Sequence, residues 1–238
     1  ANDAVSSITD VLAFDAAVAE AMRFMAKHPD ETLVVVTGDH ETGGMSLGFA
    51  GTKYDSYHTR LKNQKTSYVA FDEKFSAFRK AHPQAKLEDV LPMVKENFGL
   101  VVLSDAEAAA LPKDGDTAGM VLKPYEVDEL RAAFERSMKG RDAKNQTDQD
   151  YLLYGEYEPF TVTLTHLLNQ KSGIAWTTYS HTGVPVLTSA GGVGAERFGG
   201  FYDNTDIFTR MAEAMGLKKA AAAVLVPASG AAVAQAAN

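Results

Sequence analysis

The sequence predicts an α/β fold: part of a doubly wound, mostly parallel sheet sandwiched by helices, with a helical insertion. An amphipathic pattern that ends at His28-Pro29-Asp30 precedes a short β-branched run, Leu33 to Val36. A helix followed by a strand that is apolar on both faces is half of a parallel-sheet unit. Asp39 and His40, side chains suited to metal binding, follow that strand directly. Ligands bind at the carboxyl ends of strands in open α/β sheets, so we expect a site there.

The first expected element is an amphipathic helix of about four turns. Residues 1 to 11 are polar, and we expect them to be turn-like, with the helix beginning after them. Apolar side chains then recur every three or four residues, which predicts a helix face packed in the core. They are Phe14, Val18, Met22 and Met25.

Residues 51 to 150 differ in character, because charged and aromatic residues rise and proline and glycine interrupt the pattern often. Ser104 is expected to cap a short helix that ends before Pro112. Residues 140 to 150 are polar and predict a mobile loop. Longer helices are expected over Glu73 to Ala81, Leu87 to Phe98 and Tyr125 to Met138.

The core pattern returns after Tyr151. A helix that starts near Phe160 is expected to stop at Gly173, and a last helix capped by Asn204 or Thr205 to run to Gly216. Between them, short strands are expected at residues 174–178 and 184–189, on either side of His181, followed by a glycine-rich loop. Residues 218–238 are an alanine-rich tail.

Three side chains in the two turns are the candidate metal ligands: Asp39, His40 and His181. One carboxylate and two imidazoles suit zinc. The three could complete one catalytic zinc site or be shared between two adjacent ions, and spacing alone does not choose. For Asp39 and His40, the alternative is an ordinary strand-end turn in which the aspartate caps the backbone. We expect Glu41 to support a ligand histidine from outside the metal's own ligand set, and His166 to be structural.

The chain carries two motifs, TGDHETGG and, more than a hundred residues later, WTTYSHTGVPV. Together they resemble the C-terminal half of a bacterial alkaline phosphatase. Two flanking stretches, ANDAVSSITDVLAFDAAVAEAM and FGGFYDNTDIFTRMAEAMGL, strengthen the resemblance. It implies α/β core segments at residues 1–50 and 151–217, separated by a cap- or crown-like helical insertion at residues 51–150.

The resemblance implies a phosphomonoesterase that uses two zinc ions and one magnesium ion and forms a phosphoserine intermediate. By motif, Asp39 and His40 match ligands of the zinc beside the nucleophilic serine. His181 matches a ligand of the zinc that activates the attacking water. The serine, the phosphate-clamping arginine, the magnesium ligands and the remaining zinc ligands are expected upstream of Ala1. We therefore interpret the chain as the C-terminal part of the enzyme, with no catalytic residue assigned to it and no turnover of its own.

The implied partners are small-molecule phosphate monoesters and the N-terminal half of the enzyme, with a homodimer as a further option. Alkaline phosphatases are usually exported, so the resemblance implies a periplasmic or secreted protein. Two alternatives stay open. One is a related hydrolase of the wider superfamily, such as a sulfatase, a phosphodiesterase or a metal-dependent phosphomutase. The other is a fragment without catalytic activity.

Composition narrows the function classes. The net charge of −8 argues against a nucleic-acid surface, which normally shows a basic patch. The chain has no cysteine, so neither a disulfide nor a thiolate metal ligand is available. No apolar stretch reaches the ~18 residues that a transmembrane helix needs.

Overall fold

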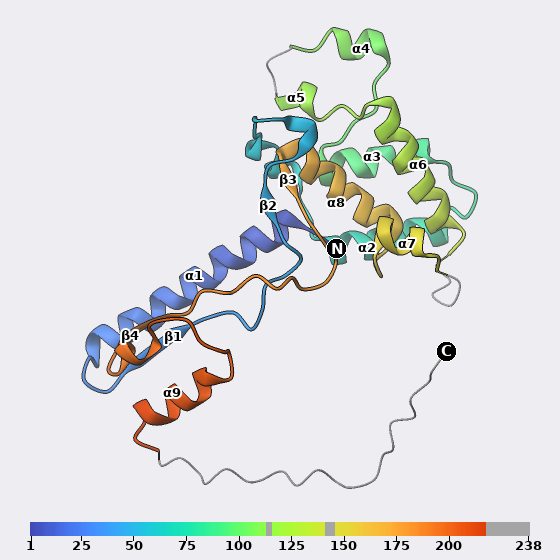
Figure 1. Ribbon diagram of the computed structural model, residues 1–238. Coiled ribbons are helices and arrows are strands. Elements are labelled where there is room, and N and C mark those ends of the chain that lie inside the picture. The colour runs from blue at the N-terminus through green and yellow to red at the C-terminus, as the bar shows by residue number, and fades with distance from the viewer. Residues whose placement is uncertain (113–115, 141–145, 218–238) are drawn as a thin grey trace, which may run out of the picture. The chain divides into compact units, whose positions relative to one another are not determined.

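The computed structural model describes residues 1–112, 116–140 and 146–217 (Figure 1). The chain divides into two compact units. Unit 1 comprises residues 1–19 and 40–186, and unit 2 comprises residues 20–39 and the part of the chain from residue 187 onward. The predicted tail at residues 218–238 and residues 141–145 of the predicted loop lie outside the described residues. The division into core segments and an insertion stays a prediction.

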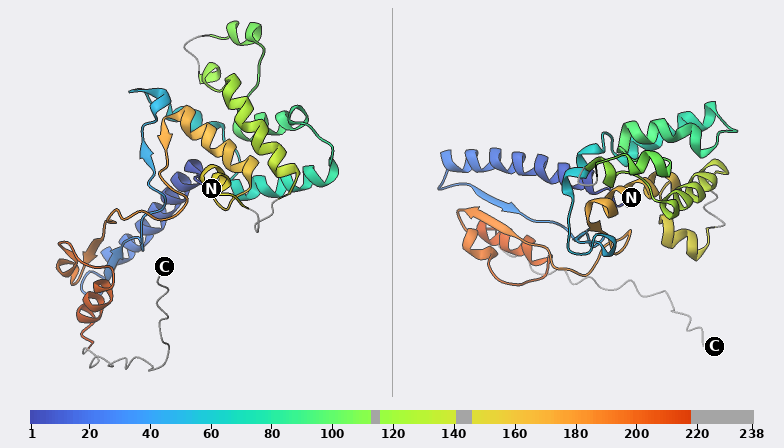
Figure 2. Two further views of the ribbon diagram at one scale, coloured as in Figure 1. Left: turned by 45° about the vertical axis from the view of Figure 1, so that its right-hand side comes forward. Right: turned by 90° about the horizontal axis from the view of Figure 1, so that it is seen from above.

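Unit 1 is mainly helical, as Figures 1 and 2 show. Its strands β2 (Ser46–Leu47) and β3 (Ile174–Ala175) form a short antiparallel pair. Helix α1 (Ala4–Lys27) begins in unit 1, and its residues from Glu20 onward belong to unit 2. The other helices of unit 1 are α2 (Tyr68–Ala81), α3 (Leu87–Phe98), α4 (Asp105–Ala109), α5 (Asp116–Gly119), α6 (Pro124–Met138), α7 (Asp148–Tyr154), α8 (Pro159–Ser172) and the 3-10 helices η1 (Ala50–Thr52) and η2 (His58–Asn63).

Helix α8 is the centre of the unit 1 core. Pro159 opens it and Gly173, with φ +79°, ends it in the left-handed conformation, as predicted from the sequence. Nearly all of its side chains are buried, including Phe160 and Leu164. Helices α2, α3, α6 and α7 contact it (Figure 1), and the rings of Phe75 and Phe160 lie 4.7 Å apart. Because α8 is buried on most of its faces, other segments must pack against those faces, and these four helices do so.

The helices predicted between residues 51 and 150 are confirmed. Helix α3 has the predicted bounds, and α6 begins one residue earlier than expected. Helix α2 is longer than predicted, because Ser67 caps it by accepting a hydrogen bond from the backbone N–H of Ala70. The predicted cap at Ser104 is a complete capping box with Glu107.

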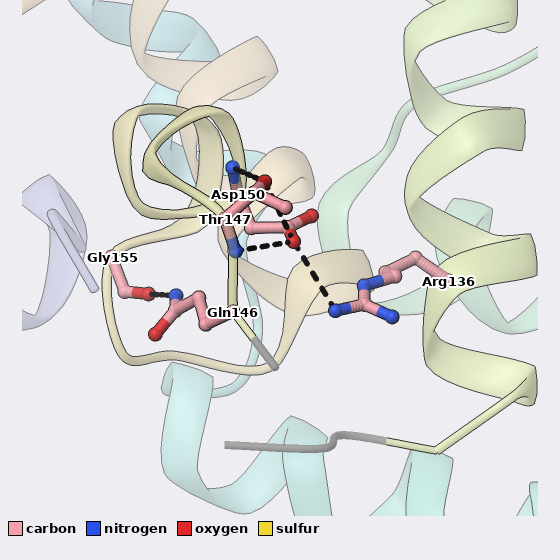
Figure 3. A network of polar contacts seen from close by, with 5 residues as sticks. All are labelled: Arg136, Gln146, Thr147, Asp150 and Gly155. Atoms are coloured by element: carbon pink, nitrogen blue, oxygen red, sulfur yellow. Dashed lines mark hydrogen bonds and ion pairs between the residues drawn. The ribbon is translucent and has the colours of Figure 1, made fainter. Parts of the chain in front are cut away.

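Helix α7 overlaps the stretch that we predicted to be a mobile loop. The Thr147 hydroxyl accepts from the Asp150 N–H at 3.0 Å, and the Asp150 carboxylate accepts from the Thr147 N–H at 3.1 Å (Figure 3). Arg136 of α6 lies 3.2 Å from the same carboxylate. The loop prediction is therefore wrong from Thr147 onward, because a Thr-x-x-Asp cap is polar in composition and yet starts a helix.

Helix α1 differs from the prediction at its start and along its apolar face. It begins at Ala4, not after residue 11, because the Asp3 carboxylate accepts from the Ser6 N–H at 3.0 Å. Phe14 and Met22 are 54% and 41% exposed, so their predicted packing in the core is wrong. Periodicity shows which face is apolar and not which segment covers it. None of the described helices combines the length and apolar content needed to cross a bilayer.

Unit 2 is built on an antiparallel pair, β1 (Leu33–Val36) and β4 (Ser189–Gly192), with η4 (Ala195–Phe198) and α9 (Asp206–Ala214). The predictions of β1 and of a final helix are confirmed. The strand predicted at residues 184–189 is wrong apart from its last residue, and β4 instead runs into the expected glycine loop. At Gly192 a side chain would overlap the Thr32 carbonyl, so this strand depends on close backbone approach rather than on β propensity.

The mostly parallel, doubly wound sheet is not confirmed. Both strand pairs in the described ranges are antiparallel, and the one parallel contact there is an isolated bridge between Val101 and Val121. A four-residue apolar run predicts that a strand forms, but the direction of its pairing is set by the segment that reaches it. For β1 that segment is the glycine-rich β4.

A buried ion pair links α8 to α6. The Lys171 Nζ lies 2.7 Å from the Glu126 Oε2, and both side chains are 6% exposed. The same ammonium donates to the Val121 carbonyl at 2.8 Å. Burial lowers the pKa of Lys171, and its hydrogen bond to Glu126 opposes that shift. Two buried charges that satisfy each other are costly to separate.

Replacing Glu126 with Gln should lower the free energy of unfolding by about 3–5 kcal/mol, because Lys171 is left as a buried charge without a counter-charge. The amide oxygen of the introduced glutamine can still accept the backbone N–H of Lys123, which Glu126 holds at the start of α6. Urea titration followed by circular dichroism measures the change.

The matched control is Glu88→Gln, which removes the same charge from the exposed pair with Arg131 at 2.8 Å. The side chains of Glu88 and Arg131 are 58% and 41% exposed, so the loss in unfolding free energy should stay below about 1 kcal/mol. Equal losses in the two variants would contradict a special role for the buried pair.

Candidate metal centre

Two loops of unit 1, residues 40–45 and 176–182, lie against each other. The backbone N–H groups of Thr177 and Thr178 both donate to the Gly43 carbonyl, at 3.0 and 3.2 Å. The Asn2 side-chain amide donates to the Thr178 carbonyl at 3.1 Å. Backbone groups far apart in sequence thus hold together the two turns that carry the histidine motifs.

Both glycines of the TGG sequence are required by this approach. Gly43 and Gly44 have φ values of +89° and +66°, which favour glycine. A Cβ on Gly43 would stand 2.9 Å from the Thr178 carbonyl oxygen, and one on Gly44 would stand 2.7 Å from the Thr177 hydroxyl. The two glycines of the motif are therefore needed for close backbone packing between the two loops.

Glu41 fastens the two loops together. Its Oε2 accepts from the backbone N–H of Thr182 at 2.8 Å and also from the Thr182 hydroxyl. Its Oε1 accepts from the backbone N–H of Gly44. These bonds, with the Thr182 hydroxyl foremost, lower the pKa of Glu41. The carboxylate thus holds the residue next to His181, which is how it supports a candidate ligand.

The imidazoles of His40 and His181 are stacked, with ring centroids 3.5 Å apart and an interplanar angle of 23°. The His40 Nδ1 lies 2.8 Å from the Glu41 carbonyl oxygen. A carbonyl only accepts, so Nδ1 donates in this contact. A histidine that ligates a metal through one nitrogen commonly donates its other N–H to a carbonyl in this way.

Both rings open onto a cavity of about 340 Å³ in unit 1. The start of α1 contributes Ser6 and Asp10 to its wall, and Tyr68 and Tyr157 contribute aromatic surface. A cavity of this size, lined by both polar groups and aromatic rings, is typical of a small-molecule site.

Within unit 1, His40 and His181 meet; Asp39, the residue before His40, belongs to unit 2. Among the described residues, no three histidine, aspartate or glutamate side chains lie close enough to hold one ion. Two imidazoles have the chemistry that zinc prefers, but a zinc site needs further donors. The role of all three residues as metal ligands stays a prediction.

His166 of α8 lies beside the site and is structural in its bonding. Its Nε2 lies 3.2 Å from the Asn2 Oδ1, and its ring stacks on Tyr179 with centroids 5.7 Å apart. Burial lowers its pKa from 6.5 to about 4. Asn2, which the sequence did not single out, connects this helix to the loop: the Asn169 amide donates to its backbone carbonyl at 2.6 Å. Asn2 has a left-handed φ of +51°, which asparagine tolerates well, but no pattern in the sequence predicts this conformation.

The solved structures give the fold class. A cold-active alkaline phosphatase from a psychrophilic Shewanella species matches with a TM-score of 0.59 over 92% of this chain and 42% of its own, at 24% identity. The fold is therefore an alkaline phosphatase-like α/β fold. The sequence profile of the alkaline phosphatase family matches residues 1–217, so the chain belongs to that family and the resemblance drawn from its motifs is confirmed.

Curated relatives agree with this assignment. The chain is 27% identical to alkaline phosphatase 3 of Bacillus subtilis, in an alignment that covers 90% of this chain and 36% of the relative. It is 29% identical to the repressible alkaline phosphatase of Saccharomyces cerevisiae, in an alignment that covers 50% of this chain and 23% of the relative. The chain therefore spans about a third or less of these relatives.

The buried His166 should make stability depend on pH. The unfolded chain takes up a proton near the ordinary pKa of 6.5, but the folded protein resists protonation until about pH 4. The His166 contribution is therefore complete above pH 6.5 and is lost on acidification towards pH 4, by up to about 3 kcal/mol. His166→Gln keeps a donor for Asn2 and should remove this component.

The measurement is the difference between wild-type and His166→Gln unfolding free energies across pH 4–7. The wild-type curve alone would not isolate His166, because Asp72 also titrates in this range. Burial, with repulsion from Glu158, raises the pKa of Asp72 to about 6, so its contribution to stability increases on acidification while that of His166 decreases. Parallel curves for the two proteins would contradict the assignment to His166.

Proposed function

We propose that this chain is the C-terminal part of a metal-dependent phosphatase that hydrolyses phosphate monoesters, with Asp39, His40 and His181 as metal ligands. The observation that carries the proposal is the pair of imidazoles stacked 3.5 Å apart at the wall of a cavity. Family membership supports a phosphatase-type hydrolase, and alkaline phosphatases are generally metal-dependent.

The assignment of these donors to two zinc ions rests on the motifs, because a ring spacing of 3.5 Å fits ligands of one ion as well as ligands of two adjacent ions. Zinc bound there would supply Lewis acidity, lowering the pKa of a coordinated hydroxyl and neutralising charge on the leaving oxygen. The motifs assign Asp39 and His40 to one ion and His181 to the other.

The chain's own residues position these donors. The Glu41 carbonyl fixes the His40 tautomer, and the Glu41 carboxylate holds the loop of His181 through Thr182. Tyr68 and Tyr157 line the cavity and would limit the access of water to a bound ester. A preorganised ligand pair in a shaped cavity is what the protein contributes to metal-assisted hydrolysis.

We further propose that the nucleophilic serine of a phosphoserine route, and the ligands for magnesium, belong to a part of the protein outside this chain. The support is that the chain spans only about a third of alkaline phosphatase 3 of Bacillus subtilis and of its alkaline phosphatase 4. Export to the periplasm or the medium belongs to the same proposal and rests on those bacterial relatives.

Zinc affinity of the chain tests the ligands. His181→Ala should weaken binding of the first zinc ion more than tenfold, because an imidazole ligand is lost. Glu41→Ala should weaken it about 10–100-fold although the histidines remain, as expected for an outer residue that orients ligands. Competition against a chromophoric chelator, with cobalt(II) absorption as a second readout, measures both.

The matched control is His58→Ala, which removes an exposed histidine of η2 that does not line the cavity. Zinc affinity should be unchanged in it. Equal affinities in wild type, His181→Ala and Glu41→Ala would contradict the metal centre.

The catalytic part of the proposal requires the polypeptide encoded by the whole reading frame that contains this chain. It should hydrolyse p-nitrophenyl phosphate, and His181→Ala should lower kcat by at least about 100-fold together with zinc content, because the clamp on the attacking oxygen is lost. The 238-residue chain alone should not turn over.

Full activity of His181→Ala with unchanged zinc would refute the assignment. Faster cleavage of p-nitrophenyl sulfate than of the phosphate ester would favour the sulfatase alternative. Activity of the isolated chain would show that it contains a nucleophile that we have not assigned.

A further inference from the structure

Unit 1 contains a second cavity, of about 390 Å³, that shares no lining residue with the first. We name it the Arg60 cavity; its charged lining residues are Lys53, Asp55, Arg60, Lys123, Glu126 and Lys171. Lys171 and Glu126 neutralise each other at 2.7 Å. Three cations then face one lining carboxylate, in a protein whose net charge is −8. Positive charge is therefore concentrated here against the overall balance.

Arg60 is held rigidly in the wall. Its Cζ lies 3.8 Å from the centre of the Tyr57 ring, and its Nη1 donates to the Lys171 carbonyl at 2.6 Å. Gly119 lies against the guanidinium so closely that any side chain there would overlap it. A guanidinium that packs against an aromatic ring and a glycine, and donates to a backbone carbonyl, has little rotamer freedom left before any ligand arrives.

Among the residues that the structure describes, the positive charge of Arg60 is only weakly compensated. Its side chain is 12% exposed, and its Nε is buried without a hydrogen-bond partner among the described residues. The nearest recorded carboxylate, that of Asp116, is 3.9 Å from Nε and is itself 56% exposed. The guanidinium therefore keeps positive charge in the cavity wall that a bound anion would neutralise.

Lys53 brings a further cation to the wall of the cavity. It is the C-cap of the 3-10 helix η1, with φ +56°, and its backbone N–H donates to the Ala50 carbonyl. The end of η1 therefore fixes the backbone from which the Lys53 side chain extends.

We infer that the Arg60 cavity binds a phosphate-bearing small molecule, with Arg60 contacting the phosphate and Lys53 and Lys123 supplying further positive charge. Arginine in a fixed orientation matches the oxygens of a phosphate, and lysines add strength without strict geometry. The volume is within the range of ligand pockets, and the Tyr57 and Tyr125 rings line the cavity beside the cations. This inference does not depend on the proposed metal centre.

The test uses the 238-residue chain without metal, in EDTA and at constant ionic strength, with pyrophosphate as the probe in isothermal titration calorimetry. Wild type should bind it saturably, with one site. The double variant Lys53→Gln/Lys123→Gln, which changes two exposed residues, should bind about tenfold more weakly. His40→Ala/His181→Ala should bind as wild type does, which separates this site from the metal centre.

The matched control is Lys80→Gln/Lys95→Gln, which removes the same charge from positions on α2 and α3 that do not line the cavity. It should bind pyrophosphate as wild type does. Gly119→Ala should abolish binding by displacing Arg60, with circular dichroism to verify folding; the lysine variants keep the test valid if it does not fold. No saturable binding by wild type, or equal weakening in both lysine variants, would overturn the inference.

Discussion

The arrangement of the site depends on one carboxylate. Glu41 accepts hydrogen bonds from both the backbone and the side chain of Thr182, 141 residues further along the chain. Bonds to an ionised acceptor are stronger than those between neutral groups, which suits a contact that must hold two separate loops. Without it, His40 and His181 would lie on loops joined mainly by the backbone contacts at Gly43.

Helix α8 supports the metal-centre cavity and the Arg60 cavity of unit 1. In its second half, Asn169 bonds to Asn2, and Asn2 in turn bonds to the Thr178 carbonyl in the loop of His181. At its end, the Lys171 carbonyl accepts from Arg60. Because α8 is held by apolar contacts on most sides, it is a rigid platform from which polar groups can be positioned accurately.

The sequence predicted local structure well where the signal is local. The α3 bounds, the Ser104 cap and the stop at Gly173 follow from patterns within a few residues, and the structure has all three. Strand β4 was missed because it is made of small residues whose pairing depends on close approach to β1. The exposure of Phe14 was missed because periodicity does not reveal whether a partner segment is present. The histidine motifs were visible as motifs, but the bond from Glu41 to Thr182 joins distant residues and leaves no pattern in one sequence.

The order of the elements along the chain has a consequence for biosynthesis. Helices α2, α3 and α6 all precede the helix that they enclose. As the chain leaves the ribosome, their apolar sides, including Phe71, Phe98 and Leu130, emerge before α8 is available to fill the space between them. Chains are made at about 5–20 residues per second, so these surfaces stay uncovered for several seconds. The nascent polypeptide would depend during that interval on chaperones that shield exposed hydrophobic segments.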